Sequence, residues 1–221
     1  KAIEQGRVIL DNLRKVITFV FATGFTEIIL VGGALLMGLP LPVLATQILW
    51  TNIVGEGLLN FAFAFEPKER DVMRRLRNTP SQRKVFTREM WFLIGLVGIA
   101  TDLILFGLFL FLQNTGHELG EIRTIMFVGL SLDSLFFAYS LRSLREPIFR
   151  ISPLANPFFL LALALSTGLL VIVFLSESLR SLLSIVPLTG LQILIIFALG
   201  VLDIILIELG KWWFIRRGEA E

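Results

Sequence analysis

Long apolar runs alternate with short charged connections along most of this chain. A run of about 20 apolar residues matches the length of an α-helix that crosses the hydrocarbon core of a bilayer. Six such runs are visible, at about 16–37, 43–65, 91–112, 122–141, 154–175 and 188–214. The pattern therefore predicts an all-α membrane protein, built as a bundle of six transmembrane helices.

The basic residues gather in alternate connections between these runs. Residues 1–15, 66–90, 142–153 and 211–221 hold 18 of the 20 Lys and Arg side chains. Cytoplasmic loops of membrane proteins carry such an excess of Lys and Arg. These four segments are therefore predicted to lie in the cytoplasm. Both termini are then cytoplasmic, which agrees with an even number of spans, because an even number places the two termini on the same side of the membrane.

The predicted organisation has three parts. Residues 1–15 form a cytoplasmic stalk helix that leads into the first span, 16–217 form the transmembrane domain, and 218–221 form a cytoplasmic tail. The loop 66–90 is too short for a catalytic domain. The chain starts without Met, and its first residues have the pattern of a helix interior. They do not resemble a signal peptide. We expect a fragment of a longer protein.

Composition narrows the chemistry that the chain can carry. The sequence is 55% hydrophobic and has no cysteine, which excludes disulfides, thiol catalysis and thiolate metal sites. The pI of about 9.3 does not indicate nucleic acid as a partner, because the basic residues lie in connections between spans. No P-loop, dinucleotide fingerprint or nucleophile–base set is present. We therefore expect no catalytic and no cofactor-binding residues in this chain.

Three polar residues lie near the middle of the first two predicted spans. With a rise of about 1.5 Å per residue, Glu27 is about 17 Å into the first span, and Asn52 and Glu56 are about 14 and 20 Å into the second. The hydrocarbon core is about 30 Å thick, so all three lie near its centre. Ionisable groups at this depth are costly, and each one is a functional hypothesis.

The spacing of these residues suggests a shared site. Asn52 and Glu56 are four residues apart and so lie on one helix face, and Thr23 and Glu27 have the same relation. The short turn "GLPLP" makes the two spans antiparallel neighbours. The two polar faces therefore form a plausible oxygen cage for a hard cation. Glycines on both sides of Glu56 favour local unwinding, which would free backbone carbonyls as further ligands.

The other intramembrane polar groups have a structural alternative. Asp102 and Asp203 stand alone in their spans, and structural pairing is the favoured interpretation for both; Asp133 lies between the two interpretations. Asn52 by itself is equally well explained as an interhelical hydrogen-bond partner. Glu208 is expected to pair with Lys211, three residues later, or to extend to the interface.

The order of motifs resembles one known family. "EQGRVILDNLRKVITFVFA" resembles the stalk and the start of the fifth membrane helix of P-type cation-transporting ATPases of the calcium-pump type. "MGLPLPVLATQILWTNIVGEGLLNFAFAFEPKERDVMRRLRNTP" is similar to the next family block, with its G-L-P turn and its L-W-x-N-x-x-x-(D/E)-G sixth helix. "IELGKWWFIRRGE" is similar to the tenth helix of bacterial members. The resemblance covers the chain as family helices five to ten.

The resemblance implies a set of metal ligands. Glu27 matches the acidic cation ligand of the fifth helix, and Asn52 and Glu56 match the Asn and the acidic ligand of the sixth. Asp133 is the nearest candidate for the carboxylate ligand that some members carry on the eighth helix. The transported cation that this set indicates first is Ca²⁺.

Two positions depart from the calcium-pump pattern. Gly24 stands where these pumps carry an Asn ligand, and Gly55 stands where they carry a Thr ligand. The departures leave open a single ion per cycle, another small cation, or protons as a co-substrate.

The resemblance also implies partners for the chain. The first four membrane helices, the phosphorylated Asp and the domains that bind Mg-ATP would belong to the missing N-terminal part of the same pump. Besides that part, the lipid bilayer is the expected partner, and no nucleic acid is. The expected location is the plasma membrane of a prokaryote. Two alternatives stay open, a stand-alone proton- or cation-coupled secondary transporter and a non-transporting membrane scaffold.

Overall fold

A computed structural model describes residues 2–68 and 85–216, and every regular element within these ranges is helical. Most of the predicted loop 66–90 and the tail 218–221 lie outside the described residues. The elements are α1 (Ala2–Glu27), η1 (Ile28–Gly32), α2 (Gly33–Leu36), α3 (Ala45–Trp50), η2 (Thr51–Glu56), α4 (Gly57–Phe63), α6 (Arg88–Gly95), η4 (Leu96–Thr101), α7 (Asp102–Asn114), α8 (Leu119–Ser140), η5 (Ile148–Arg150), η6 (Pro153–Ala155), α9 (Pro157–Leu175), α10 (Glu177–Leu183) and α11 (Gly190–Arg216).

Several of these elements join into long helical segments that match the predicted runs. Five helical segments of the described chain are long and apolar enough to cross a membrane, which confirms the all-α membrane class. They are Ala2–Leu36, Arg88–Asn114, Leu119–Ser140, Pro157–Leu175 and Gly190–Phe214. The segment formed by α3, η2 and α4 is also helical but carries Gln47, Asn52, Glu56 and Asn60, which lower its hydropathy. The count of six membrane spans therefore stays a prediction.

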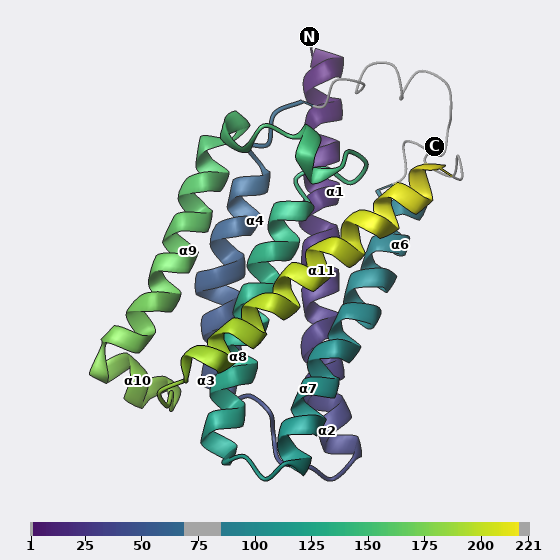
Figure 1. Ribbon diagram of the computed structural model, residues 1–221. Helices are drawn as coiled ribbons and strands as arrows, with labels where there is room; N and C mark the ends of the chain where they lie inside the picture. Colours follow the sequence, from purple (N-terminus) through teal and green to yellow (C-terminus); the bar gives the residue numbers. More distant parts are fainter. Residues whose placement is uncertain (1, 69–84, 217–221) are drawn as a thin grey trace.

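Helix α8 lies at the centre of the bundle. It packs against α7, α9, α11 and η2, and most of its residues are buried. Helix α11 crosses it obliquely, and the first residues of α1 and the last of α11 lie at the same end of the bundle (Figure 1). This arrangement agrees with the predicted placement of both termini on one side of a membrane.

The connection between α9 and α11 differs from the prediction. The sequence predicts a loop at "SESLRSLLSIVP", but this stretch contains the short helix α10. Ser176 caps this helix, because its hydroxyl accepts a hydrogen bond from the Leu179 amide, and Glu177 occupies the first turn, where a negative charge is favourable. By contrast, the predicted turn at "GLPLP" is confirmed, and Gly38 adopts there the positive φ of 66° that glycine tolerates best.

A buried ion pair holds the end of the bundle where α1 begins. The Arg142 guanidinium lies 2.9 Å from Glu66 Oε1, and both side chains are almost fully buried. Asn156 Nδ2 donates to Glu66 Oε2 at 2.7 Å, and Asn12 Nδ2 donates to the Glu66 carbonyl at 2.9 Å. These contacts connect α1, the residues after α4 and α8, and the residue that precedes α9.

The same end contains the predicted pairing of Glu208 with Lys211, which the structure confirms. Lys211 Nζ lies 2.9 Å from Glu208 Oε1 and also donates to the Ser140 carbonyl at 2.5 Å. The pair therefore fixes α11 against the end of α8.

A glycine allows α11 to approach α8 closely, and this contact gives a stability prediction. A Cβ atom at Gly200 would overlap the ring of Phe136, which is held edge-to-face against Phe197. We expect Gly200→Ala to lower the free energy of unfolding by about 1–3 kcal/mol, because the ring has to move. Denaturant unfolding in detergent measures this loss.

The control for this prediction is another helical glycine, Gly107, where an added Cβ has no neighbour within 4 Å. Gly107→Ala should leave stability unchanged or raise it by up to about 1 kcal/mol. Equal stabilities of the two variants would contradict the close contact.

Candidate functional site

The candidate site lies where α1, η2 and α8 meet around Glu56. Glu56 is the last residue of η2 and is only 9% exposed. Thr23 Oγ1, on α1, donates to Glu56 Oε2 at 2.8 Å, and Ser134 Oγ, on α8, donates to Glu56 Oε1 at 2.9 Å. Both oxygens of this carboxylate are therefore held by hydroxyl groups from two different helices.

Glu27 and Asn52 lie beside this carboxylate. Glu27 is the half-buried last residue of α1, and it lies near Asn52, which is exposed on η2. Glu27 also lies near Glu56. The structure therefore brings together the three polar residues that the sequence placed at mid-depth in the first two spans.

The helices widen at the site instead of unwinding. Thr51–Glu56 is a π-helical turn that contains Asn52 and Glu56, and a second π-helical turn, Ile28–Gly32, begins directly after Glu27. Such π-helical turns are rare in proteins overall, but those that occur are often found at functional sites. The predicted unwinding around Gly55 is therefore wrong, since the helix continues through the π turn. Ser166 Oγ, on α9, donates to the Gly55 carbonyl at 3.2 Å, so part of the displaced backbone has a side-chain partner.

The two glycines of the site leave open space. A Cβ atom at Gly24 or at Gly55 would have no neighbouring heavy atom within 4 Å. These positions therefore supply neither a side-chain oxygen nor a close packing contact.

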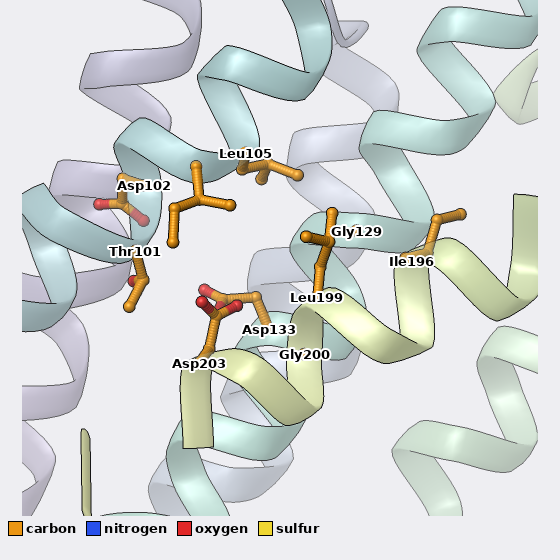
Figure 2. A pocket seen from close by; sticks show the side chains of 10 residues that line it. Thr101, Asp102, Leu105, Gly129, Asp133, Ile196, Leu199, Gly200 and Asp203 are labelled. Carbon is orange, nitrogen blue, oxygen red and sulfur yellow. The ribbon is translucent and has the colours of Figure 1, made fainter. Parts of the chain in front are cut away.

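Asp133 belongs to a second polar cluster. With Asp102 and Asp203 it lines a small cavity between α7, α8 and α11, where the carboxyl groups of Asp133 and Asp203 lie next to each other (Figure 2). Asp102 lies farther along the cavity wall, and each of the three carboxyl groups has one buried oxygen that makes no hydrogen bond within the described residues. The structural pairing expected for Asp102 and Asp203 is not tested by this contact and stays a prediction. The role of Asp133 as a ligand stays a prediction.

Ser134 is the residue of this site that sequence reasoning missed. A serine in an apolar helix is a weak signal, because its hydroxyl is usually satisfied by a carbonyl one turn earlier. A stronger signal is the spacing of Ser131 and Ser134, which places two hydroxyls on one face of α8. Ser131 faces η2 as well, with Oγ 3.4 Å from Thr51 Oγ1.

A cation at this site would need ligands other than acids. Within residues 2–68 and 85–216, no group of three or more His, Cys, Asp or Glu side chains is placed to hold a metal ion. Hard cations take amide, hydroxyl and carbonyl oxygens as readily as carboxylates. The oxygens of Asn52, Thr23 and Ser134 are the uncharged side-chain groups found here.

These observations define a polytopic α-helical membrane protein with a polar site buried among its helices. The chain belongs to the family described as "Cation transporting ATPase, C-terminus", whose sequence profile matches residues 40–213. The resemblance to P-type cation-transporting ATPases is therefore confirmed, and the chain is their C-terminal membrane domain.

Individual relatives agree with this assignment. A calcium-transporting ATPase of Bacillus subtilis is 35% identical over 78% of this chain and 19% of its own length. "Probable cation-transporting ATPase F" of Mycobacterium bovis is 32% identical over 74% of this chain and 18% of its own length. "Calcium-transporting ATPase 1" of Yarrowia lipolytica is 33% identical over 78% of this chain and 19% of its own length. The chain thus spans about a fifth of the length of the relatives it matches.

Proposed function

We propose that this chain is the ion-translocating part of an ATP-driven P-type cation pump, with Glu27, Asn52 and Glu56 as cation ligands. The observation that carries the proposal is the meeting of these three side chains in one polar site, on two helices that widen into π turns. Asp133, one residue before Ser134 on α8, is the further candidate ligand.

The proposal assigns roles to the rest of the longer protein. Mg-ATP binding and phosphorylation take place in N-terminal domains, and the first four membrane helices cover the side of the site where Asn52 is exposed. Helix α1 is continuous from Ala2 to Glu27, which suits it to pass a movement of the cytoplasmic domains to the site. Residues 1–15 are its cytoplasmic stalk, and 16–217 hold six spans with both termini in the cytoplasm.

Calcium is the cation that we propose first. Two of the relatives described above are named as calcium-transporting, and oxygen ligands from acids, amides and hydroxyls suit this ion. Bacterial relatives support a prokaryotic plasma membrane as the location.

Transport by the full-length protein in lipid vesicles tests the function. We expect ATP to drive Ca²⁺ uptake, and Glu27→Gln to raise the Ca²⁺ concentration for half-maximal uptake by about 10- to 100-fold, because one charged ligand is lost. Glu118→Gln, in an exposed turn, is the control and should behave as the wild type. Absence of ATP-driven uptake of Ca²⁺, Mn²⁺ and Na⁺ alike would contradict the pump proposal.

A further inference from the structure

The two hydroxyl groups that donate hydrogen bonds to Glu56 belong to Thr23 and Ser134 and are themselves buried. The side chains of Thr23 and Ser134 are 5% and 4% exposed, and each contacts a different oxygen of the same carboxylate. They come from α1 and α8, whereas Glu56 comes from η2. Three separate elements therefore contribute oxygens to the surroundings of one carboxylate.

We propose that Thr23 Oγ1 and Ser134 Oγ are direct ligands of the cation that binds at Glu56. The ligand class is a small hard cation such as Ca²⁺ or Mn²⁺. This inference rests on the proposed function, since it requires a cation at Glu56, and it names two ligands that the function alone does not require.

The need for such ligands follows from the composition of the site. A Ca²⁺ ion takes six to eight oxygens. No three acidic side chains of the described chain are placed to hold a metal ion together, and Gly24 and Gly55 offer no side-chain oxygen. The hydroxyls of Thr23 and Ser134, which already contact Glu56, are therefore available as further oxygen ligands of the ion.

The distances between the oxygens suit a common ion. Ligands at about 2.3–2.6 Å from Ca²⁺ lie roughly 2.8–3.4 Å from their neighbours in the shell. The hydroxyl oxygens of Thr23 and Ser134 lie 2.8 and 2.9 Å from the Glu56 oxygens. Each hydroxyl oxygen therefore already lies at the spacing of a neighbouring ligand from one oxygen of the carboxylate.

The hydroxyl protons have another acceptor when the ion arrives. Thr23 Oγ1 also lies within hydrogen-bond distance of the Phe19 carbonyl, at 3.1 Å. Its proton can turn to that carbonyl, which leaves a lone pair for the cation. For Ser134, the carbonyl four residues earlier, at Leu130, is the usual acceptor of a helical serine. Binding therefore leaves the Thr23 hydroxyl an acceptor for its proton.

Equilibrium binding of radioactive calcium to the full-length protein in detergent gives the first test. Thr23→Val and Ser134→Ala should each weaken Ca²⁺ binding by about 10- to 100-fold. The matched controls are Thr26→Val and Ser131→Ala. These hydroxyls are also buried on the same helices, and they donate to carbonyls of their own helix, at Ala22 and Phe127. The controls should bind Ca²⁺ as the wild type does.

Cysteine variants separate a ligand from a residue that only holds Glu56 in place. Sulfur prefers softer metals, so a Cys that replaces a true oxygen ligand shifts selectivity toward Cd²⁺. We expect Ser134→Cys and Thr23→Cys to raise the preference for Cd²⁺ over Ca²⁺ by about ten-fold or more. Ser131→Cys should leave this preference unchanged, and the 221 residues of this chain contain no cysteine of their own.

The outcomes distinguish this inference from the proposed function. If Glu56→Gln abolishes Ca²⁺ binding while both cysteine variants keep the wild-type metal preference, the hydroxyls are not ligands and only this inference fails. If Glu56→Gln binds Ca²⁺ as the wild type does, the proposed function fails as well. Because Thr23→Cys and Ser134→Cys lie on different helices, either variant decides the question if the other does not fold.

Discussion

Glu56→Gln is expected to weaken cation binding by about 100-fold or more in the full-length protein. Gln keeps the shape of the side chain but removes its charge, and Glu56 is more buried than Glu27. Loss of about 3 kcal/mol of attraction corresponds to about 100-fold in affinity, and a full charge in contact with a divalent ion in a low-dielectric site is worth at least that much. Equilibrium binding of radioactive calcium measures the change.

The same variant has a second expected result that separates lost binding from misfolding. A buried carboxylate without a cation is costly to the folded state, so Glu56→Gln should be as stable as the wild type or more stable when no Ca²⁺ is present. Ca²⁺ should then raise the melting temperature of the wild type and not of the variant. A variant that keeps the wild-type response to Ca²⁺ would contradict the role of Glu56.

Arg142→Ala is expected to lower the free energy of unfolding by about 3–5 kcal/mol. The substitution leaves Glu66 buried without its counter-charge, and such a break is far more damaging than the loss of a surface pair. Arg142 also donates to the carbonyls of Ser152 and Pro153, so the connection before α9 loses two contacts. Denaturant unfolding in detergent measures the loss.

An exposed ion pair of the same kind provides the control. Lys68 lies 2.7 Å from Glu4, and the two side chains are 66% and 32% exposed. Lys68→Ala should change stability by no more than about 1 kcal/mol, because solvent screens this pair. A loss at Arg142 as small as that at Lys68 would show that the buried pair does not hold this end of the bundle.

The helices could be predicted from the sequence because their signal is local. The runs that end near Met37, Leu112 and Leu175 correspond to long helical segments, since the length of an apolar run and the rise of a helix are properties of the chain itself. Helix α10 was missed because a polar helix of seven residues has no such signal. The π turns at Glu56 and after Glu27 also lack one.

The sequence by itself predicted the depth of Glu27, Asn52 and Glu56 and the helix faces on which they lie, because both follow from the rise and the period of a helix. Only the tertiary structure decided which groups meet them. In the folded chain, the hydroxyls of Thr23 and Ser134 donate hydrogen bonds to Glu56. Asp133, although next to Ser134 in the chain, lies beside Asp203 instead. The rotation of each helix about its axis depends on the packing of all its neighbours, and no single segment of the sequence contains that information.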